Sequence, residues 1–403
     1  MEKLDLEMLT LKLLSIDTQN GDDGTQFLGE TKEAVTLCAD TLRQIPDVAV
    51  EVQDYDIRDK DGKVLRKNRG NLIARLSNPM SGRPTVMLQG HLDTVPFKDN
   101  DGKLQVGWDS NPIGEKRGDI IYGRGAGDMK GPVAAMMAAF AELAVRLDLK
   151  YNPVLLLTSD EEANNFAGVK RFLKTNKDKI DFAVCSDGED FLIVDRFKGA
   201  LGYIITFEGE GGHGSRPWKG LNAIHAAIPT LQKLHELVDY IAQDRNPAFE
   251  SPDIHTAHAT MNIGKVAGGT KINSIADRCT IEFEMRPVRA PEYYLQLIGE
   301  RIISAIPREV KFSHKQTGPE AGPTTVPDNN YIHRLEECVG DVRGLPAKRG
   351  VTHGFTEAYY LNEKGITTVV LGPTSPGHHG HNEQVLLKDL ETLRDIYVTF
   401  FTK

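Results

Sequence analysis

The sequence of 403 residues has little of what marks several broad protein classes. Its four cysteines are scattered with no CxxC pair, which argues against a disulfide framework and favours a cytoplasmic, reducing location. The net charge of -9 offers no basic surface for nucleic acid. The longest apolar stretch, GPVAAMMAAFAELAV, is too short to span a membrane, and the opening MEKLDLEML lacks the features of a signal peptide.

The chain is longer than one compact core usually allows, so two domains are expected. Up to residue 198, strand-like and helix-like segments alternate, which predicts an α/β domain with a mostly parallel sheet and helices on both faces. Residues 199–316 change to half-buried alternation with two helical segments, which indicates an inserted α+β domain. Residues 317–403 return to the first pattern and complete the α/β domain.

Acids and histidines follow four of the apolar runs of the α/β domain. VMLQG is followed by His91 and Asp93, and PVLLLTS is followed by Asp160, Glu161 and Glu162. DFAVCS is followed by Asp187, and ITTVVLGP comes before His378 and His379. Open α/β sheets bind their ligands beyond the carboxyl ends of the strands. The sequence therefore predicts that these side chains converge on one site.

Each cluster alone allows a less specific interpretation. His91 and Asp93 have the spacing that lets a carboxylate fix an imidazole, but they also suit a solvated loop. Asp128 in GRGAGDMKG could cap the helix that follows, although capping alone does not need four glycines. Glu161 and Glu162 could form a solvated acidic turn, but adjacent carboxylates are favoured where a cation or separate roles accommodate them.

Taken together, the clusters supply imidazole and carboxylate groups without thiolates. Such donors suit zinc, cobalt or manganese in a hydrolytic site. Two ions bridged by one carboxylate need about five protein ligands, which is the number that the chain offers.

In this combination of motifs, the sequence resembles the M20 family of metallohydrolases, which includes deacetylases, desuccinylases, aminoacylases and peptidases. The matching segments, in order, are GHLDTVP, GRGAGDMKG, TSDEE, GGHGSRPWKGLNAI, GGTKINSIADRCTIEFEMRP, GFTEA and HGHNE. They extend over nearly the whole chain, and their order and spacing are those of the family.

The resemblance implies a ligand set for two divalent ions, Zn²⁺ first, with Co²⁺ or Mn²⁺ as alternatives. The implied ligands are His91, Asp128 as the bridge, Glu162, Asp187 and His379. His379 is preferred to His378 and His381 because the family histidine lies four residues before a glutamate, here Glu383.

The resemblance also implies the remaining roles. Asp93 orients His91, Glu161 is the general base, and His213 of the inserted domain stabilises the oxyanion in the partner subunit. The residues expected to bind substrate are Asn273, Arg286, Gly354 and Thr356. The inserted domain resembles the lid and dimerisation domain of the family, so a homodimer is expected.

Two positions depart from the family pattern, and one backbone feature is expected. Asp187-Gly188-Glu189 stands where acetylornithine deacetylases usually have Glu-Pro-Thr, and Gly127 stands where a small or polar residue is usual. The family has a non-proline cis peptide after the bridging aspartate, so one is expected between Asp128 and Met129.

The expected function is metal-dependent hydrolysis of an amide in an N-acyl amino acid, with N-acetylornithine as the leading substrate. Glu357 favours acetylornithine deacetylase, because the desuccinylase usually has a serine there. Succinyl-diaminopimelate desuccinylase and an M20 dipeptidase or carboxypeptidase remain alternatives, since single loop changes redirect specificity within one fold. A non-catalytic homologue is disfavoured because every ligand position and Glu161 carry competent residues.

Overall fold

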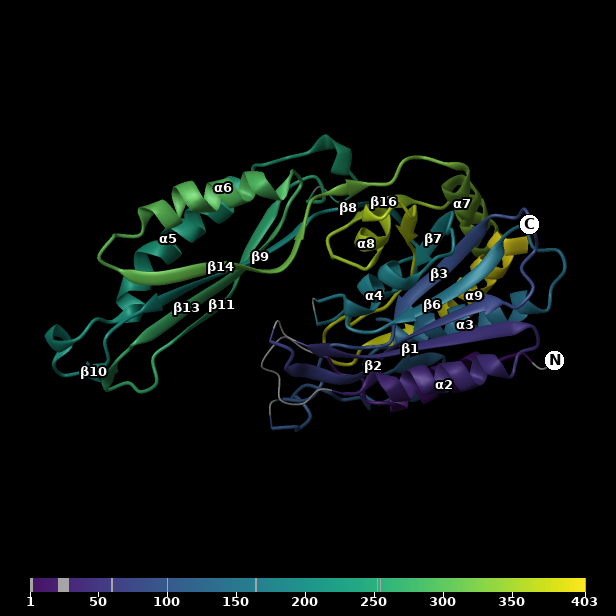
Figure 1. The fold of residues 1–403 in the computed structure, drawn as a ribbon, viewed down its shortest axis with the longest axis horizontal. Coiled ribbons are helices and arrows are strands. Elements are labelled where there is room, and N and C mark those ends of the chain that lie inside the picture. The colour runs from purple at the N-terminus through teal and green to yellow at the C-terminus, as the bar shows by residue number, and fades with distance from the viewer. Residues whose placement is uncertain are drawn as a thin grey trace. The chain divides into compact units, whose positions relative to one another are not determined.

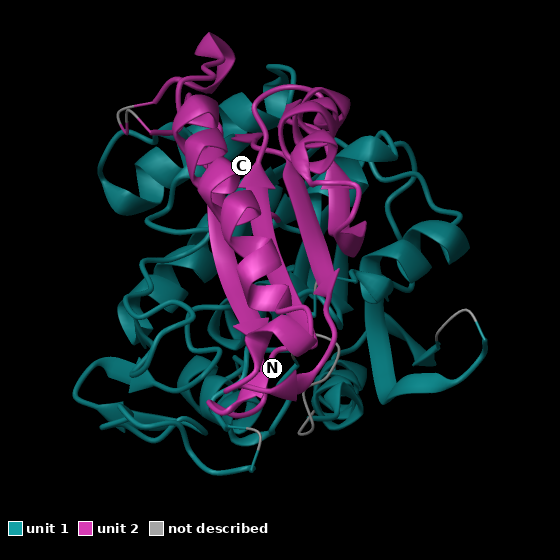
Figure 2. Ribbon diagram, turned by 90° about the vertical axis from the view of Figure 1, so that its left-hand side faces the viewer, with its two compact units in different colours: residues 1–195, 326–350, 356–403 teal, residues 196–325, 351–355 magenta. Residues whose placement is uncertain are grey.

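The computed structural model describes residues 3–20, 29–58, 61–99, 101–163, 165–251, 253 and 255–402. The chain forms two compact units (Figure 2). Unit 1 consists of residues 1–195, 326–350 and 356–403, and unit 2 consists of residues 196–325 and 351–355. Each unit has its own sheet and its own buried core.

The large sheet, most of whose strands belong to unit 1, has a parallel centre and antiparallel edges. Its strand order is β1-β2-β6-β3-β7-β17-β8-β15, with β16 also paired to β8. The central neighbours β6, β3 and β7 (Figure 1) are parallel, as is β17 beside β7, which confirms the predicted α/β class. The strands are β1 Val48–Arg58, β2 Val64–Leu76, β3 Thr85–His91, β6 Asn152–Thr158, β7 Phe182–Cys185, β8 Ile193–Phe197, β15 Thr324–Thr325, β16 Arg349–Thr352 and β17 Thr368–Val370.

Two groups of helices cover this sheet. The helix α3 contacts α1, α2 and α9, while α4 contacts α8. The strands β3 and β6 are buried almost along their whole length, as expected for parallel strands covered on both faces. The helices are α1 Leu6–Ser15, α2 Thr31–Arg43, α3 Lys130–Ala144, α4 Ala167–Thr175, α7 Asn330–Arg343, α8 Ala358–Glu363 and α9 Leu387–Thr402.

The helix α3 is the centre of the unit 1 core. Its sequence, KGPVAAMMAAFAELA, is apolar on nearly all sides, and nearly all of its residues are buried. Pro132 lies in the first turn, where a missing N–H removes no hydrogen bond from the helix. The small side chains let sheet and helices approach α3 closely, and Asp128 lies two residues before this helix.

Unit 2 is an antiparallel sheet with two long helices on one face (Figure 1). Its strand order is β11-β13-β9-β14, and a short ribbon of β10 and β12 lies beyond this sheet. Aromatic and aliphatic side chains of both helices and the sheet form one buried cluster. The elements are β9 Ala200–Glu208, β10 Gly212–His213, α5 Ala223–Ile241, β11 Thr260–Gly268, β12 Ser274–Ile275, β13 Arg278–Arg286, α6 Pro291–Arg301 and β14 Lys311–Ala321.

The structure also shows the state of the cysteines and the apolar character of the helices. All four cysteines are buried and none takes part in a disulfide. Among the described residues, no helix combines the length and apolar character that crossing a membrane requires. A second, small sheet in unit 1 joins β4 Glu115–Arg117, β5 Ile120–Tyr122 and β18 Gln384–Leu386, and so links the glycine-rich segment to the last histidines.

Candidate metal centre

The predicted ligands of unit 1 lie where neighbouring parallel strands end. His91 is the last residue of β3, Glu161 and Glu162 follow β6, and Asp187 follows β7. Because β6, β3 and β7 are adjacent and parallel (Figure 1), their carboxyl ends lie on one side of the sheet, and these side chains come together there. Asp128 reaches the same edge from the start of α3.

The carboxylate of Asp128 is the shared contact of this cluster. Its Oδ1 lies 3.1 Å from Nε2 of His91, and its Oδ2 lies 2.9 Å from Nε2 of His379. His378 also approaches Oδ2, with its Nε2 at 3.0 Å. Nε2 of His379 lies 3.3 Å from Oε2 of Glu162 as well. The structure therefore joins imidazoles from β3 and from the loop before β18 through one carboxylate.

The capping interpretation of Asp128 is wrong. The N-cap of α3 is Met129, and no side chain caps this helix. The peptide bond between Asp128 and Met129 is cis, which confirms the expectation from the family resemblance.

Three groups within the cluster have donor atoms close enough to hold an ion, with all donor atoms of a group within 4.8 Å of one another. The groups are Asp128 with His378 and His379, His91 with Glu161 and Glu162, and His91 with Asp128 and Asp187. Because His91 and Asp128 are each shared between two groups, the three form one continuous cluster.

The buried carboxylates repel one another in this cluster. Burial and then the charge of Asp128 raise the pKa of Glu162 and of Asp187 to about 7. Burial also raises the pKa of Glu161, and the carboxylates of Glu162 and Asp187 raise it further. Burial favours the neutral form of His91, but the hydrogen bond to Asp128 and the negative charges of Asp128, Glu161 and Asp93 together outweigh burial and raise its pKa. The cluster thus holds more negative charge than its imidazoles neutralise.

The side chains present fit a divalent cation. The donors are carboxylate oxygens and imidazole nitrogens without a thiolate, a set that suits zinc, cobalt or manganese. Oε1 of Glu162 is buried and has no hydrogen-bond partner, which is unusual for a buried carboxylate oxygen. A cation would satisfy this atom and relieve the repulsion among the acids.

Asp93 contacts His91 through its backbone. Nδ1 of His91 lies 2.9 Å from the backbone oxygen of Asp93 and 3.7 Å from its Oδ1. The carboxylate of Asp93 instead accepts hydrogen bonds from the backbone N–H groups of Glu161 and Glu162, at 3.3 and 3.1 Å. One residue therefore fixes the end of β3 and the acidic turn after β6.

A second carboxylate network, which the sequence patterns did not indicate, lies behind Asp93. Nδ2 of Asn20 donates to Oδ2 of Asp93 at 3.0 Å and to Oδ1 of Asp160 at 2.8 Å. Asp160 also pairs with the buried guanidinium of Arg69, at 3.3 Å from Nε. Burial raises the pKa of Asp160 to about 6. Of these residues, only Asp160, which directly precedes Glu161, belongs to a cluster found in the sequence. Asn20 lies in no motif.

Glu357 has its carboxylate in the interior of unit 1. It accepts hydrogen bonds from Gln89 on β3 and from Thr158 on β6, and it is 1% exposed. Burial raises the pKa of Glu357 to about 7. The neighbouring Thr356 is also buried, and its Oγ1 accepts from the backbone of Ala358 at 3.2 Å. Glu357 thus ties two strands of the centre together.

The other histidines of the HGHNE region differ in their contacts. Nδ1 of His378 lies 3.4 Å from Glu189, whereas His381 packs edge-on against Trp108 with ring centroids 5.9 Å apart. Only His379 contacts both Asp128 and Glu162.

Three of the predicted site residues belong to the main body of unit 2, and Gly354 lies in its short segment 351–355. His213 on β10 is exposed, and its Nδ1 lies 2.8 Å from Oγ of Ser215. Asn273 is adjacent, because its backbone oxygen accepts from Gly214 at 2.8 Å. Arg286 ends β13 and pairs with Glu284 at 2.9 Å.

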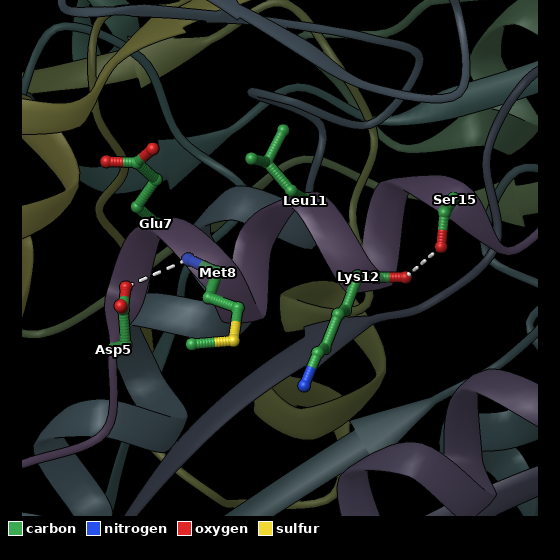
Figure 3. Close-up of a pocket in the computed structure, with 6 residues that line it drawn as sticks. All are labelled: Asp5, Glu7, Met8, Leu11, Lys12 and Ser15. Atoms are coloured by element: carbon green, nitrogen blue, oxygen red, sulfur yellow. Dashed lines mark hydrogen bonds between the residues drawn. The ribbon is translucent and has the colours of Figure 1, made fainter.

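A surface hollow on unit 1 lies elsewhere. It runs along α1 and is lined by Asp5, Glu7, Met8, Leu11, Lys12 and Ser15 (Figure 3). The side chains lining it come from one helix, and none belongs to the cluster around Asp128.

An α/β unit with a carboxylate–imidazole cluster at the ends of its parallel strands defines a candidate site for divalent metal ions. The sequence profile of peptidase family M20/M25/M40 matches residues 87–403, and the chain belongs to this family. It is therefore a hydrolase that acts on amide bonds.

Two curated relatives with different names are similar to this chain to nearly the same degree. Succinyl-diaminopimelate desuccinylase of Xanthomonas euvesicatoria is 28% identical over 336 residues, which cover 80% of this chain and 84% of the relative. Acetylornithine deacetylase of Pectobacterium carotovorum is 27% identical over 340 residues, which cover 82% of each. The two identities are too similar to separate the substrates.

Solved structures share the fold at lower identity. Human carnosine dipeptidase 1 superposes with a TM-score of 0.77 at 18% identity, covering 99% of this chain and 95% of that one. A metallo-carboxypeptidase of the M20 family from Sulfolobus solfataricus also gives 0.77, at 16% identity, with 99% and 98% covered. These likenesses establish the fold.

The packing of Gly127 against Ser375 explains one departure from the family pattern and gives a test of the site. A Cβ on Gly127 would lie 1.5 Å from Oγ and 2.1 Å from Cβ of Ser375, so rotating the hydroxyl would not relieve the overlap. We expect Gly127→Ala to lower the free energy of unfolding by about 1–3 kcal/mol and to weaken Zn²⁺ binding by displacing Asp128. Urea unfolding and calorimetric titration with Zn²⁺ measure the two effects.

A second substitution separates this overlap from a general effect of alanine. Adding Ser375→Gly to Gly127→Ala removes both overlapping atoms and is expected to restore stability and Zn²⁺ affinity. The control Gly340→Ala lies within α7, where the nearest atom to a new Cβ is 3.7 Å away, and should leave binding unchanged. Failure of the double variant to recover would contradict the packing explanation.

Proposed function

We propose that this protein removes the acyl group from an N-acyl amino acid, with N-acetylornithine as the leading substrate, by metal-dependent hydrolysis of the amide. The observation that carries the proposal is the placement of the buried Glu161 within the cluster, where it shares one group with His91 and Glu162. Bound divalent ions would supply an acidified water and polarise the amide carbonyl. Zn²⁺ is the first choice on the donor set, with Co²⁺ or Mn²⁺ as alternatives.

The proposed ligands divide into two sets around Asp128. His91 and Asp187 would hold one ion, Glu162 and His379 the other, and Asp128 would bridge them. The distances from Asp128 to His91 and His379, and from His379 to Glu162, support this division. His378 approaches Asp128 as closely as His379 does, but its other nitrogen faces Glu189.

Glu161 is the proposed general base. Burial and then the surrounding carboxylates raise the pKa of Glu161, which makes its carboxylate a stronger base than that of a solvated glutamate. It would then deliver this proton to the departing amine. Asp93 supports this step by fixing His91 through its carbonyl and by binding the N–H of Glu161 through its carboxylate.

The oxyanion donor is proposed to come from a second copy of the chain. His213 lies beside Asn273 next to β12, whereas Arg286 ends β13, eight residues beyond its first residue, Arg278. At the rise of an antiparallel strand this separates them by roughly 27 Å along one unit. A substrate as small as an acyl amino acid cannot touch both within one copy. We therefore assign His213 and Asn273 to the site of the partner subunit, and Arg286 to the subunit's own site.

Unit 2 has a surface that suits this homodimer. Apolar side chains are exposed on α5 and on β11, which is an edge strand of its sheet. An uncovered edge strand readily pairs with another chain. The exposed residues are Ile224, Ile228 and Tyr240 on α5 and Val266 on β11, with Leu221 just before α5.

Arg286, Gly354 and Thr356 are the proposed substrate contacts of the same subunit. The planar guanidinium of Arg286 suits the carboxylate of an amino acid. Gly354 and Thr356 lie on either side of the point where the chain passes from unit 2 back to unit 1. The fully reduced, buried cysteines agree with the cytoplasm as the proposed location.

Desuccinylation is the alternative that a specific observation favours. A curated relative with that name is as similar to this chain as the deacetylase is. Glu357 separates the two in sequence, but its carboxylate points into the interior toward Gln89 and Thr158, so its effect on the substrate would be indirect. A dipeptidase or carboxypeptidase would retain the same centre.

The substrate assignment is tested by amine release from a panel of amides. The panel holds N-acetylornithine, other N-acetyl amino acids, N-succinyl-diaminopimelate and dipeptides, each assayed after chelation and after addition of Zn²⁺ or Co²⁺. We expect turnover that disappears on chelation, returns with the ion, and is greatest on N-acetylornithine. Greater turnover on another amide would reassign the substrate, and metal-independent turnover would overturn the mechanism.

The role of Glu161 is tested by Glu161→Gln. The amide cannot accept a proton from water, so kcat is expected to fall by at least about 10²–10⁴-fold while Zn²⁺ stoichiometry is kept. Stopped assays and metal analysis of the same sample measure both quantities. Retention of more than a tenth of the activity with ions bound would exclude Glu161 as the base.

Mixing two inactive variants tests the contribution of the second copy. His213→Ala and Glu161→Gln are each expected to lack activity as homodimers. After subunit exchange, one of the two sites in each heterodimer combines an intact Glu161 with an intact His213, so about a quarter of wild-type activity should return. A mixture that exchanges subunits but stays inactive would place His213 in its own subunit's site or outside it.

A further inference from the structure

Glu383 is a buried carboxylate that touches neither the shared carboxylate of Asp128 nor any imidazole of the cluster. It is fully buried, and it immediately precedes β18. From the sequence, Glu383 is notable only because the preferred histidine, His379, lies four residues before it. Its contacts in the structure indicate a role of its own.

The carboxylate of Glu383 binds the backbone of the glycine-rich segment. Oε1 accepts from the N–H groups of Gly127 and Asp128, both at 2.9 Å, and Oε2 accepts from the N–H of Gly125 at 3.0 Å. The backbone oxygen of Glu383 also accepts from Gly123 at 3.0 Å. The loop that presents Asp128 is thus wrapped around one side chain.

Arg124 completes the connection on the histidine side. Its Nη1 donates to Oε2 of Glu383 at 2.7 Å, and its Nη2 donates to the backbone oxygen of Gly380 at 2.8 Å, with that of His379 at 3.4 Å. Both side chains are buried, so the pair is held in a low-dielectric environment. The ring of Trp108 lies against the guanidinium, with its centroid 5.3 Å away.

These contacts join two loops that lie far apart in the sequence. One loop carries Asp128, and the other carries His379, which is 251 residues away. The carboxylate of Glu383 fixes the N–H of Asp128 itself, and Arg124 fixes the carbonyls next to His379. The distance between the two proposed ligands is therefore set by this pair.

We propose that Glu383, held by Arg124, is a positioning residue that sets the geometry of Asp128 and His379 and so determines how tightly the centre binds its cations. The inference rests on the proposed function in that it takes these two residues as ligands. It adds a residue that touches neither ion nor substrate and acts through the backbone of a ligand.

The donor count explains why a glutamine could not replace this carboxylate. Glu383 faces four N–H donors, two on each oxygen. A glutamine offers a carbonyl oxygen to one side only and presents its own N–H₂ to donors on the other. Glu383→Gln keeps the size of the side chain, yet it releases either Asp128 or the Arg124 side.

The test is Co²⁺ titration of the full-length protein after removal of metal by a chelator. Visible absorption of bound Co²⁺ reports its coordination, and circular dichroism of the same samples reports folding. We expect Glu383→Gln to raise the dissociation constant for at least one Co²⁺ by about 10–100-fold and to change the Co²⁺ spectrum, while the protein remains folded.

The matched control is Glu336→Gln, another ion pair of unit 1 between a glutamate and an arginine. Glu336 accepts two hydrogen bonds from Arg349, both at 2.7 Å, and contacts no member of the cluster. It is expected to affect thermal stability alone. If Glu383→Gln likewise lowers only the melting temperature and leaves the Co²⁺ affinity and spectrum unchanged, Glu383 is merely structural and the inference is overturned.

Two further outcomes separate the inference from the proposed function. Wild-type protein that binds no Co²⁺ would overturn both. Loss of Co²⁺ affinity in Glu383→Gln, with wild-type protein inactive on every amide of the panel, would overturn the substrate assignment and support the inference. If Glu383→Gln does not fold without metal, Arg124→Lys gives the same test, because it keeps the charge and loses the fork that reaches both Glu383 and Gly380.

Discussion

One buried carboxylate, that of Asp128, holds the centre together. It is 4% exposed, and a charge so far from water is stable only when opposite charges or donors surround it. Imidazoles from two distant parts of the chain, His91 and His379, meet this requirement. The end of β3, the start of α3 and the loop before β18 must therefore all arrive at the same point. The packing of α3 against the sheet and the cradle formed by Glu383 can both be understood as ways of fixing that point.

The parallel sheet explains why so many acids gather there. Adjacent parallel strands end on the same side, so residues that follow β6, β3 and β7 are neighbours whatever their separation in sequence. The result is an excess of buried carboxylates whose pKa values are raised by burial and by each other. Water cannot relieve this repulsion in the interior, whereas a divalent cation can. The same crowding that makes the centre unfavourable without an ion suits Glu161 to proton transfer.

The two units divide the proposed reaction between them. Unit 1 contains the proposed ligands and the base, while unit 2 carries exposed groups that suit a substrate. Arg286 lies at the end of β13, whereas His213 pairs with Ser274 before the start of β13, so in the proposed reaction one copy would not present both to a small molecule. Association through the exposed face of α5 and β11 would supply the missing group. A homodimer is then a requirement of the proposed chemistry and not only a means of covering apolar surface.

The sequence by itself determined the fold class and the positions of the clustered acids, because apolar runs report burial and because His91, Glu161 and Asp187 directly follow such runs. The tertiary structure alone decided which groups meet. Asn20 reaches Asp93 across 73 residues, and Gln89 reaches Glu357 across 268, and no local pattern records contacts of that range. It also decided that the backbone of Asp93 contacts His91, and that Glu383 supports Asp128. Periodicity encodes which face of an element is buried, whereas the partner on that face is chosen by the packing of the whole unit.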